Sequence, residues 1–394
     1  KKLAFAAITT VAIYVVVEGV VTAVAWSLRW GTTLWLYEDS GRTVRFDPIR
    51  GYRLTRTPSR FLRATDGRLE YIATIRGNSQ GFPDRDDFGP RRTSAGVPRL
   101  AVFGDSFTEG QYLGQSWPDR AEDLAREAGQ PVELLNFALG GAGLANWWSV
   151  LTKLVVAENY EIDGVLFVVF AGDLRREFTV SDHQGRVRPL FGRTPSWDPA
   201  TYPTSLDAAR SFLKEQDFAI LSPAEFERAV QGHWPRGVSR PVQPYILTHI
   251  WRRVVLNWPG RAPGAPPPPD ESGRDRLIAD IRRVLEERHL PALVVHIPDR
   301  AELIDVGRSP EAMRRESRAF AEAIGARFLD GGLIFEGLSR AEIRGLFFPH
   351  DGHWNQAGSD RFAAFLLRTA DGLVPDSHGK LSWLMIPGRW HKGS

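Results

Sequence analysis

An unbroken apolar stretch near the start of the 394-residue chain constrains its fold more than any other feature. Residues 3–28 have the sequence LAFAAITTVAIYVVVEGVVTAVAWSL and carry one formal charge, that of Glu18. An α-helix needs about 20 apolar residues to cross the hydrocarbon of a bilayer, so this stretch is long enough to span it. The apolar core of a cleaved signal peptide is shorter, about 7–15 residues. We therefore expect an uncleaved transmembrane anchor over residues 1–30.

Glu18 lies close to the middle of this predicted span. A charged side chain at that depth costs about 2.5–3.5 kcal/mol on insertion scales and usually faces a partner or a polar cavity. Gly19 and Ala23 form a small-xxx-small pair beside it, a spacing that lets a second transmembrane helix approach closely. Two explanations stay open: a protonated Glu18 tolerated in a very apolar helix, or a contact of these three residues with a transmembrane helix of a larger complex.

The amino-acid composition of the whole chain excludes several classes of protein. The chain contains no cysteine, which rules out disulfides, zinc–thiolate sites and thiol nucleophiles. The chain contains 50 Lys and Arg residues and 47 Asp and Glu residues, so its net charge is +3. No basic cluster is interleaved with aromatic residues, so we expect no nucleic-acid partner.

From residue 99 onward, apolar runs typical of buried strands alternate with amphipathic stretches. Residues 164–172, GVLFVVFAG, are apolar enough for a strand that is buried on both faces. The same pattern predicts further strands at 98–106, 132–139, 291–298 and 326–330, and helices at 117–129, 274–289, 310–324 and 356–371. Strands alternating with helices indicate an α/β domain in which a parallel sheet lies between two layers of helices.

Residues suited to nucleophilic chemistry gather in four polar segments. Three follow predicted strands, GDSFT at 104–108, NFALGGAG at 136–143 and AGD at 171–173, and the fourth, HDGHWN at 350–355, precedes the last helix. Parallel sheets carry their sites at the carboxyl ends of their strands. A serine on a tight strand-to-helix turn exposes its hydroxyl, a histidine can take its proton, and an aspartate can orient the imidazole. The alternatives are that Ser106 is a turn residue, His353 a structural histidine and Asp173 a loop cap.

In these segments the chain resembles the SGNH, or GDSL-type, hydrolase superfamily. The first family block is matched by GDSFTEG at 104–110, with Ser106 in the nucleophile position, and the second by NFALGGAG, with Gly141 on the oxyanion glycine. Asp351 and His353 are similar to the D-x-H arrangement of the alginate-acetylating branch, and residues 75–88 resemble the leader that many bacterial members carry. The resemblance covers about residues 75–175 and 275–370. It implies a flavodoxin-like fold and Ser–His–Asp catalysis, with the oxyanion held by the backbone N–H groups of Ser106 and Gly141.

The third family block is where the chain departs from the pattern. The family has G-x-N-D, whose asparagine side chain donates to the oxyanion, but Gly172 stands at the asparagine position here. Loss of one oxyanion donor typically lowers the rate by about 10²–10³. The departure leaves the expected fold untouched and puts efficient catalysis in doubt.

Two cofactor sites are suggested by short motifs and rejected. His350 and His353 with Asp351 imitate a metal site, but the ligand set is incomplete. Gly141 and Gly143 after a strand imitate a dinucleotide loop, but Asn146 occupies the third glycine position. We expect neither a metal nor any other cofactor.

The expected organisation is a transmembrane anchor at 1–30, a leader at 31–98, an α/β domain at 99–372 and an apolar tail at 373–394. Residues 175–270 form an insertion in that domain, and its end, 261–270, is polyproline-like. Two functions stay open. One is an esterase or O-acyltransferase acting on an envelope ester or polysaccharide, held in a bacterial inner membrane with its soluble domain in the periplasm. The other is a non-catalytic accessory subunit of a membrane complex, such as a bioenergetic assembly, that uses the same fold.

Overall fold

The computed structural model describes residues 2–27, 33–39, 44–110, 112–170, 172–183, 189–216, 218–234, 246–247, 271–304 and 311–369. The polyproline-like stretch 261–270 and the tail 373–394 lie outside these residues. The chain divides into two compact units. The smaller comprises Lys1–Asp39, Phe61–Ile72 and Asp217–Glu271, and the larger comprises Ser40–Arg60, Ala73–Gln216 and Ser272–Ser394.

The larger unit is built on a parallel five-stranded sheet. Its strands lie in the order β14-β13-β8-β6-β7, and each neighbouring pair is parallel. Their bounds are β6 Arg99–Phe103, β7 Glu133–Asn136, β8 Gly164–Phe170, β13 Ala292–Ile297 and β14 Arg327–Asp330. Numbered along the chain, these five strands have the flavodoxin-like order 2-1-3-4-5, which reverses between β6 and β8. All five were expected from the sequence, and the predicted fold class is confirmed.

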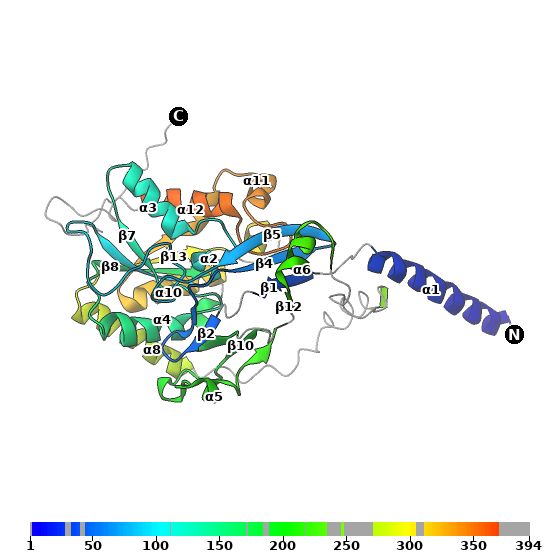
Figure 1. The fold of residues 1–394 in the computed structure, drawn as a ribbon, viewed down its shortest axis with the longest axis horizontal. Coiled ribbons are helices and arrows are strands. Elements are labelled where there is room, and N and C mark those ends of the chain that lie inside the picture. The colour runs from blue at the N-terminus through cyan, green and yellow to red at the C-terminus, as the bar shows by residue number, and fades with distance from the viewer. Residues whose placement is uncertain are drawn as a thin grey trace. The chain divides into compact units, whose positions relative to one another are not determined.

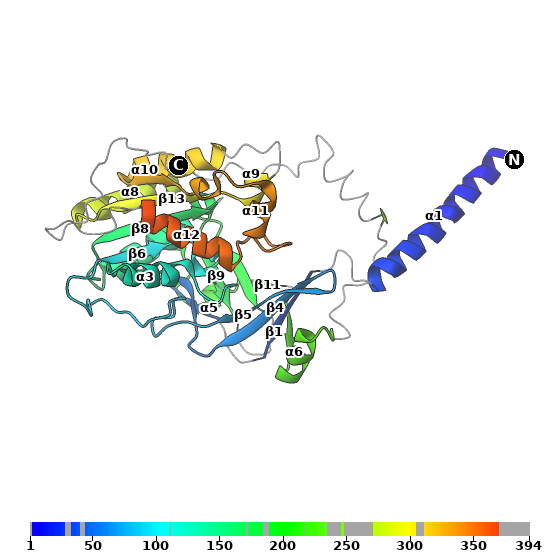
Figure 2. The same cartoon turned by 90° about the horizontal axis from the view of Figure 1, so that it is seen from above.

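Helices cover both faces of this sheet (Figures 1 and 2). One face packs against α3, Trp117–Glu127, and α12, Gln356–Thr369, through Leu100, Leu166 and Val295. On the other face, the Phe167 ring meets Trp147 of α4, Leu144–Val150, and Phe320 of α10, Glu311–Ile324. Figure 2 shows β6, β8 and β13 between α3 and the pair formed by α10 and α8, Glu271–Glu287. The result is the expected three-layer α/β/α arrangement.

Short antiparallel strands from outside the sheet also belong to the larger unit. β2, Val44–Asp47, pairs with β3, Gly51–Leu54, and β9, Thr179–Asp182, pairs with β10, Leu190–Arg193. β10 also pairs with β11, Lys214–Glu215, and the short helix α5, Leu206–Ala209, lies between them in sequence. These strands come from the predicted leader and insertion, so both segments contribute folded structure to the unit that holds the sheet.

The smaller unit contains the apolar N-terminal helix and a four-stranded sheet. The sheet has the order β12-β1-β4-β5, from Ala219–Leu221, Thr33–Glu38, Ser59–Thr65 and Arg68–Ile75. One face packs Leu36 and Leu62 against Phe226 of α6, Pro223–Val230. The helix α1 runs from Lys2 to Ser27, and its part Phe5–Ala25, with a mean hydropathy of 2.0, is long and apolar enough to cross a membrane.

Glu18 of α1 has four hydrogen-bond donors within this chain. The Tyr14 hydroxyl donates to Oε2 at 2.8 Å and the Thr22 hydroxyl to Oε1 at 2.9 Å. The backbone N–H groups of Ile246 and Leu247 donate to the same two oxygens at 2.9 and 3.0 Å. The carboxyl is therefore satisfied by residues of its own chain. Gly19 and Ala23 are exposed, and their expected contact with a partner helix stays a prediction.

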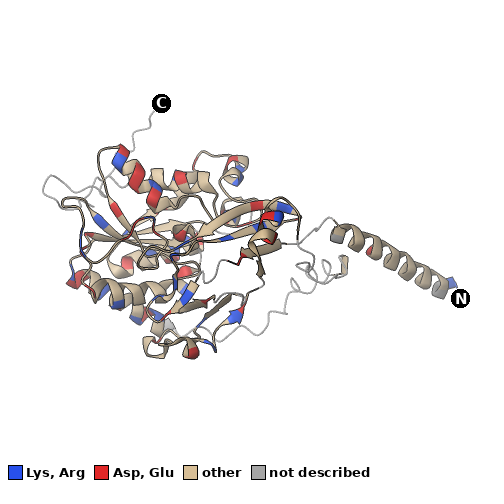
Figure 3. Cartoon of the chain, in the orientation of Figure 1, with Lys and Arg blue, Asp and Glu red and all other residues tan. Residues whose placement is uncertain are grey.

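Charges of both signs are interspersed on the surface helices (Figure 3). On α8, for example, Arg282 pairs with Glu286, and Arg283 pairs with Glu287 and Asp280. Such exposed pairs contribute little to stability.

Candidate active site

Ser106 lies on the tight turn that connects β6 to the short helix α2, Ser106–Glu109. The preceding residue, Asp105, caps this helix, because its carboxylate accepts the backbone N–H of Phe107 at 3.0 Å. Gly104 is required at the start of the turn, since a Cβ there would collide with the side chain of Thr108. The turn therefore fixes the backbone of Ser106 at the carboxyl end of β6, beside the point where the strand order reverses.

The structure brings Ser106, His353 and Asp351 together although they lie about 250 residues apart in sequence. The Ser106 Oγ lies 2.7 Å from His353 Nε2, and His353 Nδ1 lies 2.5 Å from Asp351 Oδ1. The same carboxylate oxygen accepts the backbone N–H of His353 at 3.0 Å, which fixes the loop geometry. A hydroxyl, an imidazole and a carboxylate in this order can move a proton away from the serine.

The surroundings of the imidazole leave it open on one side. Phe107 and Tyr112 place their ring centroids 4.8 and 4.6 Å from that of His353. The His353 side chain is 22% exposed, whereas that of Asp351 is 4% exposed. The carboxylate is therefore shielded from water while the serine–histidine pair stays within reach of a substrate.

Arg300 of α9, Arg300–Ile304, holds the loop that carries Asp351 and His353. Its Nη1 lies 2.7 Å from the carbonyl oxygen of Phe348, 3.0 Å from that of Pro349 and 3.1 Å from that of Asp351. One guanidinium thus fixes three carbonyls of a loop that has no regular secondary structure.

The Gly140–Ala142 loop is held through its carbonyl groups. The Tyr52 hydroxyl donates to the Gly140 oxygen at 2.9 Å, and the Thr179 hydroxyl donates to the Gly141 oxygen at 2.9 Å. Gly141 has a φ of +73°, a conformation that favours glycine. In the described part of the chain its N–H donates no hydrogen bond. It is thus free to donate to an oxyanion, as the resemblance predicts.

Arg176 connects this loop to the two carboxylates that flank the site. Its Nη1 donates to the Ala142 oxygen at 3.0 Å and to Asp105 Oδ2 at 3.2 Å, and it forms an ion pair with Asp173 Oδ1 at 2.6 Å. Burial and the nearby Asp105 raise the pKa of Asp173 well above its usual range, and Arg176 opposes this. Asp173 also accepts the backbone N–H of Phe170 at 2.8 Å, so it acts as a loop cap, the first of the two roles weighed for it.

The place of the missing asparagine is open space. Gly172 has a φ of +82°, and a Cβ built on it would have no heavy atom within 4 Å. The neighbouring Ala171 lies outside the described residues.

Two motifs imitate cofactor sites, and the structure shows the surroundings of their described residues. Among the described residues, no group of three or more His, Asp or Glu side chains could hold a metal ion. Asn146, in the imitated dinucleotide loop, donates from Nδ2 to the carbonyls of Arg50 and Thr179, both at 2.9 Å. It therefore ties separate segments together.

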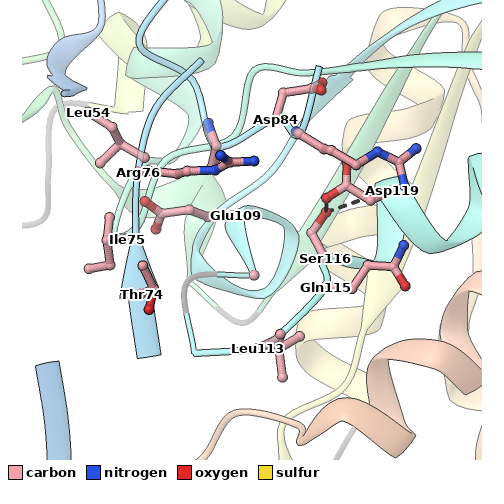
Figure 4. A pocket seen from close by; sticks show the side chains of 14 residues that line it. Leu54, Thr74, Ile75, Arg76, Asp84, Glu109, Leu113, Gln115, Ser116 and Asp119 are labelled. Atoms are coloured by element: carbon pink, nitrogen blue, oxygen red, sulfur yellow. Dashed lines mark hydrogen bonds between the residues drawn. The ribbon is translucent and has the colours of Figure 1, made fainter. Parts of the chain in front are cut away.

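A second feature, a pocket of about 290 Å³, lies at the far end of α2 (Figure 4). Glu109 and Arg76 are at one end of it, and Ser116 and Asp119 are at the other. Burial raises the pKa of Glu109 to about 8, helped by Asp105 and opposed by the backbone N–H of Gly140. Burial likewise raises the pKa of Asp84, another lining residue, to about 8, helped by Asp119. These carboxyl groups hold protons up to neutral pH, and none contacts Ser106 or His353.

Sequence reasoning named Ser106, His353 and Asp351, which the structure brings together, but missed the residues that hold the surrounding loops. Arg176, Arg300, Tyr52 and Thr179 bond backbone carbonyls through their side chains, and no local motif marks such contacts. The one available signal was Arg176 itself, three residues after Asp173, a spacing that permits an ion pair.

The chain matches no protein-family model and no curated protein sequence. Solved structures similar to it include TesA, at 13% identity and a TM-score of 0.36, covering 70% of this chain and 99% of that one. Axe2, an acetylxylan esterase from Geobacillus stearothermophilus, is 13% identical with a TM-score of 0.35, and the match covers 71% of this chain and 97% of Axe2. AlinE4, an SGNH-hydrolase family esterase, is 11% identical with a TM-score of 0.32, and the match covers 71% of this chain and 98% of AlinE4. These identities and TM-scores are too low to indicate a substrate.

Proposed function

We propose that this chain is a membrane-anchored SGNH-type serine esterase or O-acyltransferase that acts on an ester of envelope polysaccharide or a similar acyl ester. The observation that carries the proposal is the continuous relay from Ser106 through His353 to Asp351, with contacts of 2.7 and 2.5 Å. A buried carboxylate, an imidazole and an accessible serine hydroxyl in line are the groups that acyl transfer requires.

In the proposed reaction Ser106 Oγ attacks the carbonyl carbon of the ester while its proton passes to His353 Nε2. Asp351 accepts the hydrogen bond of Nδ1–H, which fixes the tautomer and stabilises the imidazolium. The new C–O bond pushes the carbonyl electrons onto oxygen, where the N–H groups of Ser106 and Gly141 donate to the negative charge. His353 then protonates the leaving oxygen. Water or an acceptor hydroxyl next attacks the acyl carbon while its proton passes to His353, and Ser106 Oγ leaves and takes that proton back.

The apolar helix α1 supports the proposed location. A single-pass anchor through residues 3–28 would hold the soluble part at the surface of a bacterial inner membrane, and we place that part in the periplasm. An enzyme tethered in this way would meet envelope esters.

A fluorophosphonate probe tests the proposal directly, since it modifies only an activated serine. The full chain in mild detergent is expected to be labelled, and Ser106→Ala and His353→Ala are expected to lose the label. Ser211→Ala is the matched control, because Ser211 is exposed and, among the described residues, its hydroxyl bonds only the Ala208 carbonyl. An unlabelled wild type, or equal labelling of wild type and Ser106→Ala, would contradict the proposal.

A non-catalytic accessory subunit of a membrane complex is the second candidate, and Gly172 in place of the family asparagine is the observation that favours it. Under this proposal Gly19 and Ala23 would meet a partner's transmembrane helix. Purification in mild detergent separates the two candidates: the accessory role requires a stable complex, and an isolated chain that still reacts with the probe contradicts it.

A further inference from the structure

The site lacks one hydrogen-bond donor of the family pattern, at the position of Gly172. In the family pattern an asparagine side chain at this position reaches the oxyanion. Here the residue has no side chain, and the space around the position of its Cβ is empty for 4 Å. A donor for that space must come from another segment of the same unit.

The β9–β10 hairpin, part of the insertion, lies against the oxyanion loop. Thr179 of β9 donates its hydroxyl to the Gly141 carbonyl at 2.9 Å. Phe191 of β10 is equally close, since a Cβ on Gly141 would lie 2.9 Å from the Phe191 Cζ. One face of this hairpin therefore covers the loop that carries the oxyanion glycine.

The strand register places Arg193 on that same face. Phe191 and Arg193 are two residues apart on β10, so their side chains leave the strand on one side. Arg193 is the cross-strand partner of Thr179, and such partners have Cβ atoms about 4.5–5.5 Å apart. The Arg193 side chain thus starts next to a side chain that touches Gly141.

The guanidinium of Arg193 has no polar partner among the described residues: it makes no hydrogen bond or salt bridge there. Its Cζ atom lies 6.0 Å from the centroid of the Phe191 ring. Arg193 is exposed to solvent, yet desolvation and the nearby Arg176 lower its pKa, while Glu177 and Asp173 oppose this. Arg193 therefore lies within electrostatic range of the Gly172–Asp173 turn. Arg176, by contrast, is committed to Asp105, Asp173 and the Ala142 carbonyl.

We propose that Arg193 supplies the oxyanion donor that the chain lacks at Gly172. When Ser106 Oγ bonds to the carbonyl carbon and the electron pair moves onto the carbonyl oxygen, Arg193 donates an N–H hydrogen bond to that oxygen. Arg193 keeps its proton throughout, because a guanidinium does not deprotonate in proteins. The proton of Ser106 still goes to His353 and from there to the leaving oxygen. The inference rests on the proposed function, and it makes the insertion a part of the catalytic site.

The experiment is a double-mutant cycle between Arg193→Met and Gly172→Asn, measured as hydrolysis of p-nitrophenyl acetate by the full chain in mild detergent. This substrate is neutral, so charge recognition does not enter. Arg193→Met is expected to lower kcat by about 10²–10³-fold with little change in KM. Gly172→Asn is expected to restore at least about tenfold of that loss in the Arg193→Met background and to change the wild type much less, because each donor substitutes for the other. Asparagine is among the residues that accept a positive φ, so the turn should tolerate it.

Arg210→Met is the matched control, since Arg210 lies in the same insertion on an exposed ion pair with Asp207 and should leave kcat unchanged. An active wild type whose kcat is the same in Arg193→Met would overturn the inference and leave the proposed function standing. A wild type that reacts only after Gly172→Asn would also overturn it, while supporting Ser106 as the nucleophile. If neither form reacts with the ester or with the fluorophosphonate, the proposed function itself fails.

Discussion

The two halves of the site are built in different ways. The half that would move the proton, Ser106, His353 and Asp351, is complete, and its residues stand in motifs that resemble those of the SGNH superfamily. The half that would hold the oxyanion has Gly141 in place but lacks the family asparagine, and a hairpin from the insertion lies over it. In each half one arginine donates to a backbone carbonyl of the site: Arg300 to that of Asp351, and Arg176 to that of Ala142.

The difference follows from where the residues sit on the scaffold. Ser106 lies three residues after the end of β6 and His353 three residues before the start of α12, so the sheet and its covering helices set their positions. The oxyanion half depends on side chains from β3, β9 and β10, which lie outside the parallel sheet. The parallel sheet and its helices therefore constrain the residues of the proposed proton relay, whereas an inserted segment contributes to the oxyanion half.

The largest effect is expected in the relay half, from Asp351→Asn. The amide cannot accept the Nδ1–H bond as the carboxylate does, so the imidazole loses both its tautomer and its stabilising charge. Removal of the carboxylate from such a relay lowers kcat by about 10⁴-fold. Hydrolysis of p-nitrophenyl acetate measures this loss, and a kcat within tenfold of wild type would contradict the role of Asp351.

In the oxyanion half, the variant Arg176→Met is expected to lower the free energy of unfolding. This change leaves Asp105 and Asp173 buried without their shared cation, a loss of about 3–5 kcal/mol for a broken buried pair. Chemical denaturation in detergent measures the free energy of unfolding. The double variant Asp173→Asn with Arg176→Met should lose less, because one buried charge is removed together with its partner. Equal losses in the two variants would show that the ion pairs are not the cause.

A smaller effect is expected from Arg300→Met in the relay half. The loop keeps its side chains but loses the donor that fixes three carbonyls next to His353. Loss of this support should lower kcat about tenfold, or about 1.4 kcal/mol, with KM unchanged. Arg300→Lys retains a donor and should recover part of the activity. An unchanged kcat in Arg300→Met would mean that Asp351 and His353 are positioned without it.

The most gradual effect is a pH dependence from the acidic pocket at the far end of α2. Burial raises the pKa of Glu109 from 4.5 to about 8, so between these values the folded chain keeps a proton that the unfolded chain releases. The free energy of unfolding should therefore fall as pH rises through this range, by at most about 1.4 kcal/mol per pH unit for this group. Glu109→Gln cannot ionise, and its melting temperature should fall less steeply than that of wild type between about pH 5 and pH 8. Parallel curves would contradict the buried, protonated state.

The sequence was sufficient for the sheet, because each of its strands carries its own signal. Residues such as Val165, Phe167 and Val169 are buried, and the apolar run of β8 marks it as a central strand. Ser106, His353 and Asp351 were also predictable, because each stands in a short motif.

The strands of the predicted leader and insertion were not predictable, for a physical reason. β3, GYRL, and β4, SRFLRAT, interrupt their apolar pattern with arginines, and β11 has only two residues. Their pairing depends on contacts with distant segments, as between β1 and β12. The same holds for Arg176, whose three partners come from three separate loops. Such contacts are visible only once the chain is folded.

The most direct test of the central claim is to trap the acyl-enzyme. The full chain is mixed with excess p-nitrophenyl acetate, quenched in acid, digested and analysed by mass spectrometry. The account predicts one acetyl group on the peptide that contains Ser106, and none on that peptide in His353→Ala. Hydrolysis with no acetyl group on Ser106, or acetylation of Ser106 that persists in His353→Ala, would contradict it.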